Sequence, residues 1–167
     1  MEMGKLPCAG DATASRQRFF YCASQGLLKH AIPANRGGNG NRFADMVNAH
    51  EALGKACKDS GLLLSINAHL WGALFPLLNY GNAQQQENYI HKLMAGLLVG
   101  GHAITEIQAG SDLNALAMTA VCTEEGFLLN GRKRFITNTP IADLLVVYAR
   151  LDNKLSAFIV HNDDEGA

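Results

Sequence analysis

The chain has little charge and almost no excess of either sign. Of its 167 residues, 17% are charged, and the formal net charge is −1. Proteins that hold nucleic acid through its phosphates usually carry a basic stripe or patch. The local basic cluster at 131–134 (GRKR) is too short to form one. We therefore expect no nucleic-acid partner.

Paired cysteine motifs are also missing. The four cysteines, Cys8, Cys22, Cys57 and Cys122, form no CxxC pair, and none has a histidine at metal-binding spacing. This pattern favours free thiols in a reducing compartment and excludes the common zinc and redox motifs. The first 18 residues have no apolar core of a secretory signal. We expect a cytoplasmic protein without a bound metal.

No apolar run is long enough for a membrane span. The longest, at 62–78, is interrupted by polar residues and Pro76, and it is shorter than the roughly 20 residues that a span requires. We interpret it as a buried helix that Pro76 kinks or ends. The hydrophobic fraction of 48% is typical of a globular chain.

Helical spacing of apolar residues dominates the first part of the chain. Ser15 is a candidate cap for the first helix, Gly61 is a candidate stop for the second, and Asn82 with Gln85 has the capping-box spacing. The segments with helical spacing are 15–28, 42–60, 62–78 and 82–96.

Short strands replace helices after Gly100. The turn signals are 124–126 (EEG) and Asn130-Gly131, which is typical of hairpins. The predicted strands are 101–105, 116–123, 126–137, 142–150 and 154–162. Helices followed by strands predict an α+β fold. We expect an N-terminal α-helical domain at 1–98 and an incomplete antiparallel β-barrel-like domain at 99–167.

Two motifs could bind a cofactor. In 103–115 (AITEIQAGSDLNA), Gly110 and Ser111 offer backbone N–H groups and a hydroxyl to an anion such as a pyrophosphate, and Thr105 lies at a strand end. In 134–139 (RFITNT), Phe135 and Thr137 repeat the strand-end arrangement. Together these residues are similar to a flavin cradle, although each motif alone is also typical of an ordinary turn.

Other candidate sites carry less weight. Glu106 is expected to hold the turn by accepting backbone hydrogen bonds rather than to act as a base. The glycines at 37–40 (GGNG) lack the spacing of a dinucleotide-binding loop. We find no Ser-His-Asp or Cys-His arrangement, and the dispersed histidines are expected to be structural.

These motifs, taken in order, resemble the acyl-CoA dehydrogenase family of flavoproteins. AITEIQAGSDLNA matches the family signature, and GLLKHAIPANRGGNG, YGNAQQQENYIHKLMAG and NGRKRFITNTPIADLLVVYAR resemble its other landmarks. The resemblance extends from about residue 18 to near the end of the chain. It implies an FAD-dependent enzyme that desaturates an acyl thioester between its α and β carbons, carried on coenzyme A or a carrier protein.

The resemblance also implies roles for individual residues. The thioester's pantetheine arm would contact the backbone around Ser111, and Thr137 would lie near flavin N5. The implied FAD contacts are His102, Ile104 and Thr105 along the ring, Gly110 and Ser111 at the pyrophosphate, and Phe135, Ile136 and Thr137 at the other edge of the ring.

The sequence departs from the family in several ways. His102 replaces an aromatic residue and Ile107 replaces proline, and Gln108 has no obvious partner. We expect the first helix and the C-terminal four-helix domain, which supplies the family's catalytic base, to be absent. The chain would then contribute flavin and thioester contacts, in a homo- or hetero-oligomer, with little activity alone. The alternative is a non-catalytic truncated paralogue that binds a thioester, a carrier protein or a partner subunit.

Overall fold

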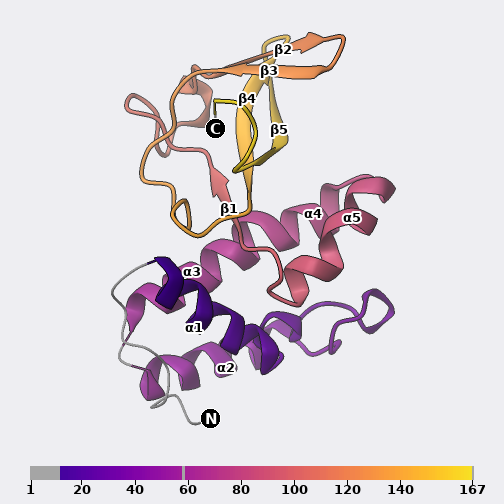
Figure 1. Cartoon of the computed structure of the whole chain (residues 1–167), viewed down its shortest axis with the longest axis vertical. Coiled ribbons are helices and arrows are strands. Elements are labelled where there is room, and N and C mark those ends of the chain that lie inside the picture. The colour runs from indigo at the N-terminus through magenta and orange to yellow at the C-terminus, as the bar shows by residue number, and fades with distance from the viewer. Residues whose placement is uncertain (1–11, 58, 167) are drawn as a thin grey trace.

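The structure is a computed structural model that describes residues 12–57 and 59–166. Helices form the first part of the chain and strands the second, so the predicted α+β class is confirmed. Figure 1 shows the helices grouped below and the strands above, joined where β1 leaves the helical part. Cys8 lies outside the described residues.

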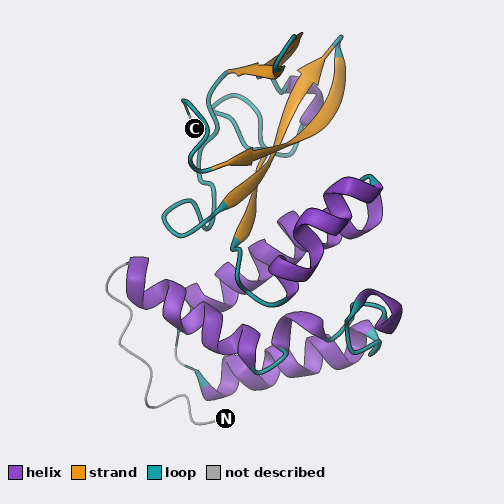
Figure 2. Cartoon of the chain, turned by 45° about the vertical axis from the view of Figure 1, so that its right-hand side comes forward, coloured by secondary structure: helices purple, strands orange, loops and turns teal. Residues whose placement is uncertain are grey.

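The helical part consists of helices joined by short turns. Figure 2 shows them together on one side of the molecule. Their bounds are α1 Ala12–Ser24, α2 Phe43–Ala56, α3 Ser60–His69, α4 Phe75–Tyr80 and α5 Ala83–Met94, with a π-helical turn at Leu70–Leu74 and 3-10 turns at Leu27–Lys29 and Ala34–Arg36.

Capping side chains decide the helix boundaries. Asn82 and Gln85 form the predicted capping box, each side chain accepting a backbone N–H of the other at 2.9 Å. The prediction for Ser15 is wrong, because α1 begins at Ala12. The prediction for Gly61 is also wrong. Asp59 accepts the Leu62 N–H at 3.1 Å and starts α3 there, so Gly61 lies inside that helix.

Pro76 does not end the apolar helix. One continuous helix of 21 residues runs from Ser60 to Tyr80, longer than the sequence predicted. Proline in a helix removes one backbone N–H donor and crowds the carbonyl four residues earlier. The π-helical turn directly before α4 has wider hydrogen-bond spacing, so the helix continues past Pro76. By length and composition alone this helix could cross a membrane, but 56% of its apolar window is buried inside the structure.

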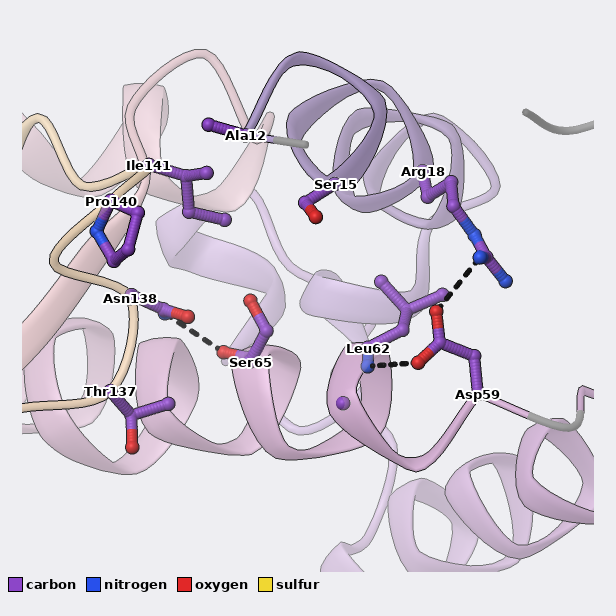
Figure 3. Close-up of a pocket in the computed structure, with 11 residues that line it drawn as sticks. Ala12, Ser15, Arg18, Asp59, Leu62, Ser65, Thr137, Asn138, Pro140 and Ile141 are labelled. Atoms are coloured by element: carbon purple, nitrogen blue, oxygen red, sulfur yellow. Dashed lines mark hydrogen bonds and ion pairs between the residues drawn. The ribbon is translucent and has the colours of Figure 1, made fainter. Parts of the chain in front are cut away.

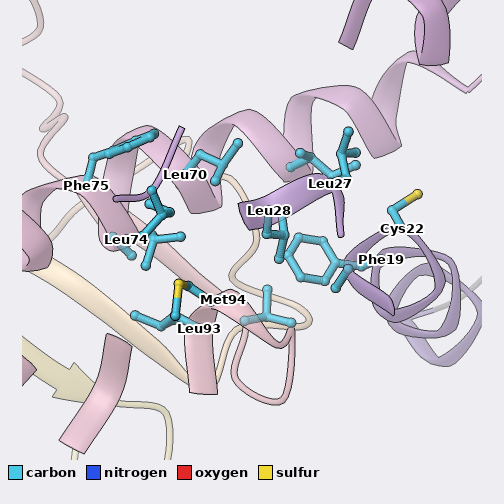
Figure 4. Packing of buried hydrophobic residues seen from close by; sticks show 14 of the residues in the cluster. Phe19, Cys22, Leu27, Leu28, Leu70, Leu74, Phe75, Leu93 and Met94 are labelled. Atoms are coloured by element: carbon cyan, nitrogen blue, oxygen red, sulfur yellow. The ribbon is translucent and has the colours of Figure 1, made fainter. Parts of the chain in front are cut away.

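The core lies between the long helix and its neighbours. Figure 4 shows Phe19, Leu28, Leu70, Leu74 and Leu93 converging from α1, the first 3-10 turn, the π-helical turn and α5. The same cluster includes Val99, Leu144 and Val146, which precede β1 or belong to β4. The helical part and the start of the sheet therefore share one core.

The sheet is mixed and open among the described residues. Its strands are β1 Gly100–Ala103, β2 Thr119–Thr123, β3 Gly126–Asn130, β4 Leu144–Leu151 and β5 Lys154–His161. The predicted antiparallel pairing holds for β2 with β3 and for β4 with β5. β1 is instead parallel to β4, and β2 meets β4 in parallel at one residue pair.

The predicted strand at 126–137 is too long. β3 ends at Asn130. The next residue, Gly131, has a φ of +154° and packs closely on Met118, since a Cβ added to Gly131 would lie 2.7 Å from Met118 Cγ. Phe135 and Asn138 then adopt φ values of 58° and 74°. Left-handed residues cannot continue a strand, so 131–138 forms an irregular segment.

Candidate functional site

The glycine pair before the first motif lets β1 lie between two layers. A Cβ added to Gly100 would lie 2.5 Å from the Cβ of Ala73 in the π-helical turn. A Cβ added to Gly101 would lie 2.8 Å from the carbonyl oxygen of Thr137. Only glycine permits both approaches. Gly100 and Gly101 thus bring the 103–115 motif and the 134–139 motif against the same strand.

Asn138 fixes the segment that carries Thr137. Its Nδ2 donates to the Gly100 carbonyl at 2.9 Å and to the Ser65 carbonyl at 3.0 Å. These bonds tie the segment to β1 and to α3 and hold the left-handed backbone of Asn138 in place. Asparagine tolerates that conformation better than most residues.

Phe135 presents an exposed ring on a strained backbone. Its φ of 58° is unusual for a bulky residue, and its side chain is 78% exposed. The Arg134 guanidinium lies 4.2 Å from the ring centroid. Strained backbone clusters at functional sites, and an aromatic side chain that is largely exposed is a candidate ligand contact.

A buried ion pair joins the 103–115 motif to Lys133, the residue directly before the 134–139 motif. Lys133 Nζ lies 2.7 Å from Glu106 Oε1, and their side chains are 6% and 2% exposed. The same ammonium donates to the Ile104 carbonyl at 3.0 Å, and the Arg134 N–H donates to the Thr105 carbonyl at 2.9 Å. Thr105 and Phe135 therefore stand in a fixed relation to each other.

Glu106 has the structural role that the sequence predicts. Its carboxylate accepts the backbone N–H groups of Ala117 at 2.7 Å and Met118 at 3.0 Å. Gln108, which had no obvious partner in the sequence, donates to it at 2.7 Å. Burial raises the pKa of Glu106, but hydrogen bonds from Lys133 and the backbone outweigh burial and hold that pKa below its usual value. An ionised carboxylate with this many donors is a poor candidate base.

The Gly-Ser-Asp turn lies at the surface. Gly110 and Ser111 are exposed, and an added Cβ at Gly110 would meet nothing within 4 Å. Asp112 accepts the Asn114 N–H at 2.9 Å and caps the 3-10 turn Leu113–Ala115. The structure thus leaves open space beside the backbone at Gly110.

Three hydroxyls at the site are available to a ligand. Thr105, Ser111 and Thr137 make no side-chain hydrogen bond with any residue that the structure describes. The nearby Thr139 hydroxyl, by contrast, donates to the Ile136 carbonyl at 2.9 Å. Thr105, Ile104, Ile136 and Thr137 are each half-buried. This donor set fits a flat polar ring flanked by a phosphate group.

His102 faces the helical part of the molecule. It is half-buried, and a Cβ added to Gly72 in the π-helical turn would lie 2.4 Å from its Nδ1. Burial lowers the pKa of His102, which favours a neutral ring. The predicted ring contact at this position would therefore involve a neutral imidazole packed on a glycine.

His69 is a structural residue, as expected for the dispersed histidines. It is fully buried, its Nδ1 accepts the Gly100 N–H at 2.9 Å, and its Nε2 donates to the Leu93 carbonyl at 3.1 Å. Burial lowers the pKa of His69 to about 4. The imidazole fastens β1 to α3 and α5.

Two residues that hold the site in place were not predicted from the sequence. Lys133 and Asn138 belong to the 130–150 landmark of the family resemblance, but neither was predicted to have a role of its own. The left-handed preference of asparagine after a strand was the available signal for Asn138. Within 12–57 and 59–166, no group of three or more His, Cys, Asp or Glu side chains could hold a metal ion.

A cavity of about 470 Å³ adjoins Thr137. It lies between α1, α3 and the 137–141 segment, as Figure 3 shows. Its lining residues are Ala12, Ser15, Arg18, Asp59, Gly61, Leu62, Ser65, Thr137, Asn138, Pro140 and Ile141. Thr137 lies at one edge of the cavity, and Figure 3 shows its hydroxyl pointing away from the space.

Two protein-family models match this chain. The family model "Acyl-CoA dehydrogenase, N-terminal domain" matches residues 9–97, and the model "Acyl-CoA dehydrogenase, middle domain" matches residues 101–167. Together the two models match most of the chain.

Individual relatives match over most of this chain but only part of their own length. An L-prolyl-[peptidyl-carrier protein] dehydrogenase of Serratia sp. (strain ATCC 39006) is 36% identical over 149 residues, which is 86% of this chain and 39% of that protein. The mitochondrial isovaleryl-CoA dehydrogenase of Pongo abelii is 34% identical over 84% of this chain and 34% of its own length.

Solved structures with the same fold include "PigA with FAD and proline", at a TM-score of 0.85 and 34% identity over 90% of this chain and 41% of that one. The "Prolyl Acyl Carrier Protein Oxidase AnaB" has a TM-score of 0.85 and 36% identity over the same shares. The chain thus spans about two fifths of the length of these proteins.

Proposed function

The chain belongs to the acyl-CoA dehydrogenase family, and on that premise we propose that it forms part of a flavin-dependent acyl thioester dehydrogenase. The cofactor is FAD, and the substrate is an acyl group on coenzyme A or on a carrier protein. The observation that carries this proposal is the Glu106–Lys133 ion pair, which holds the Thr105 and Phe135 segments together and leaves their outer groups free.

The free groups fit the parts of FAD. Thr105 and Thr137 would donate hydrogen bonds to the polar edge of the ring, and the exposed face of Phe135 would be covered by it. Gly110 and Ser111 would approach the pyrophosphate through open space. His102, Ile104 and Ile136 would complete the walls beside the ring. The backbone around Ser111 would also contact the pantetheine arm of the thioester.

FAD, when bound, supplies the hydride acceptor of the desaturation. The residues of this chain would orient the ring, exclude water from one side of it and position the thioester against it. We assign no catalytic base, because Glu106 is buried and paired with Lys133, and Asp112, the other acid of the motif, caps the 3-10 turn Leu113–Ala115. We therefore propose that another part of the assembly supplies the base and that this chain alone has little activity.

Flavin retention tests the cofactor site directly. The chain is mixed with FAD and desalted, and its visible absorption spectrum is recorded. Gly110→Ala is treated in the same way, with Thr123→Ala as an exposed control in β2 away from the site. Alanine at Gly110 has room in the free protein, so stability should be unchanged while flavin retention falls roughly 10-fold through crowding of the pyrophosphate. Equal retention by Gly110→Ala and the parent chain would contradict the placement of the pyrophosphate.

A non-catalytic binding role is the second candidate. Val121, Phe127 and Leu128 are large apolar residues exposed on β2 and β3, and they favour contact with another polypeptide. Oligomer formation in a cytoplasmic setting is consistent with both candidates. Oxidation of an acyl thioester with an artificial electron acceptor, once the partner polypeptide is added, would support the enzyme. Flavin-free binding of a thioester without turnover would support the alternative.

A further inference from the structure

The cavity beside Thr137 contains a polar group that the fold itself does not use. Ser65 Oγ is buried and has no hydrogen-bond partner among the described residues. Figure 3 shows this hydroxyl pointing into the cavity, with Thr137 and Asn138 on one wall and Arg18 and Asp59 on the opposite one. A buried polar atom without a partner destabilises the folded state, so its presence requires an explanation.

The helix offers this hydroxyl an alternative that it does not take. Serine within a helix usually faces solvent or donates to the carbonyl four residues earlier. Two asparagines of the same long helix make that bond, Asn67 to Leu63 at 2.9 Å and Asn79 to Phe75 at 2.8 Å. Ser65 instead aims inward, towards the cavity.

Other residues define what could occupy the space. Leu62, Pro140 and Ile141 give the cavity apolar walls. Arg18 lies on the far wall, its side chain only 12% exposed, with Nη1 paired to Asp59 at 2.8 Å. Arg18 Nε is also buried without a partner in the described part of the chain. The occupant is therefore apolar for most of its surface, with at least one hydrogen-bonding atom.

The position of Ser65 indicates where along the ligand its hydrogen-bonding atom lies. Its carbonyl accepts a hydrogen bond from Asn138, the residue next to Thr137. We propose that the acyl group of the substrate carries a hydrogen-bonding oxygen or nitrogen within a few bonds of its β-carbon, and that Ser65 recognises this atom. The inference rests on the proposed function, because it places the reacting carbons at the Thr137 end of the cavity.

A pair of thioesters matched in size tests the inference. The N-acetylcysteamine thioesters of 3-hydroxybutanoate and 3-methylbutanoate differ by a hydroxyl in place of a methyl group. Their binding to the full chain is measured by titration calorimetry, with and without FAD, for the parent protein, Ser65→Ala and the control Ser60→Ala. Ser60 is an exposed serine at the start of the same helix, outside the cavity.

We expect the hydroxylated probe to bind roughly 3- to 10-fold more tightly to the parent chain and to Ser60→Ala, and the preference to vanish in Ser65→Ala. Equal binding of the two probes, a preference that survives in Ser65→Ala, or no binding of either probe would each overturn the inference. Flavin retention is scored separately. A Ser65-dependent preference in a chain that retains no flavin would support the cavity assignment and count against the proposed cofactor site.

Discussion

Replacing Lys133 with methionine tests whether the buried ion pair holds the site together. Methionine keeps most of the side-chain volume but leaves the Glu106 carboxylate with no cation and the Ile104 carbonyl without its donor. Removing one partner of a buried pair typically costs 3–5 kcal/mol, so we expect a loss of about 4 kcal/mol in the free energy of unfolding. Arg132→Met, an exposed change one residue away, should cost roughly 0.5 kcal/mol or less.

Urea denaturation measures both losses, and a double-mutant cycle with Glu106→Gln separates the pair from its surroundings. The double variant should be less damaged than the sum of the single variants by more than about 1 kcal/mol, because neither charge is then left unpaired. Additive losses, or a loss below about 1 kcal/mol for Lys133→Met alone, would refute the assigned role of the ion pair.

The pH dependence gives an independent check on the same variant. In the parent chain the pKa of Glu106 lies below its usual value, so ionised Glu106 stabilises the folded state. This stabilisation is fully present above the unfolded-state pKa of about 4.3, and it is lost as pH falls through the lower folded-state pKa. Without Lys133, burial opposes ionisation with less compensation. The difference in stability between parent and variant should therefore narrow as pH falls towards 4. A constant difference would contradict a charge-based role.

Two further predictions concern the frame around the site. Burial lowers the pKa of His69 to about 4, so the folded state holds this imidazole neutral. As pH falls from about 6.5 to 4, the unfolded state binds a proton that the folded state does not, and the free energy of unfolding should fall by about 3 kcal/mol. In His69→Gln, urea titrations across that range should show a smaller fall. An unchanged pH slope in His69→Gln would contradict this. Asn138→Ala removes two hydrogen bonds and puts alanine at φ 74°, so it should cost about 2–4 kcal/mol and lower flavin retention, whereas Asn138→Gly should recover retention in part.

Local signals in the sequence were enough to predict the elements and several of their ends. The capping box at Asn82 and the turn at 124–126 depend on residues within a few positions of each other, and both predictions correspond to observed elements. The hairpin predicted at Asn130-Gly131 is wrong, because the irregular segment 131–138 follows β3 there. Glu106 was correctly expected to accept backbone hydrogen bonds, although its donors, Ala117 and Met118, are 11 and 12 residues away in the chain.

Contacts between residues that are distant in the chain could not be predicted from the sequence. Lys133 lies 27 residues from Glu106, and their pairing depends on β3 ending at Asn130 and on the turn that follows. The π-helical turn was equally hidden, because its residues have ordinary helical spacing and Pro76 alone suggested a break. This turn lets β1 pack against the long helix, since a Cβ added to Gly100 would lie 2.5 Å from the Cβ of Ala73.

The site is shaped by the helical part as much as by its own motifs. Neither segment that carries the free hydroxyls forms regular structure, so contacts from outside must fix its backbone. Asn138 ties one segment to Ser65 of α3, and His69 holds Gly100, where the other segment begins. Arg16 of α1 donates to Asp143, which in turn accepts the Val99 N–H. A change in the packing of α1 or α3 should therefore alter flavin and thioester binding even where it touches neither ligand.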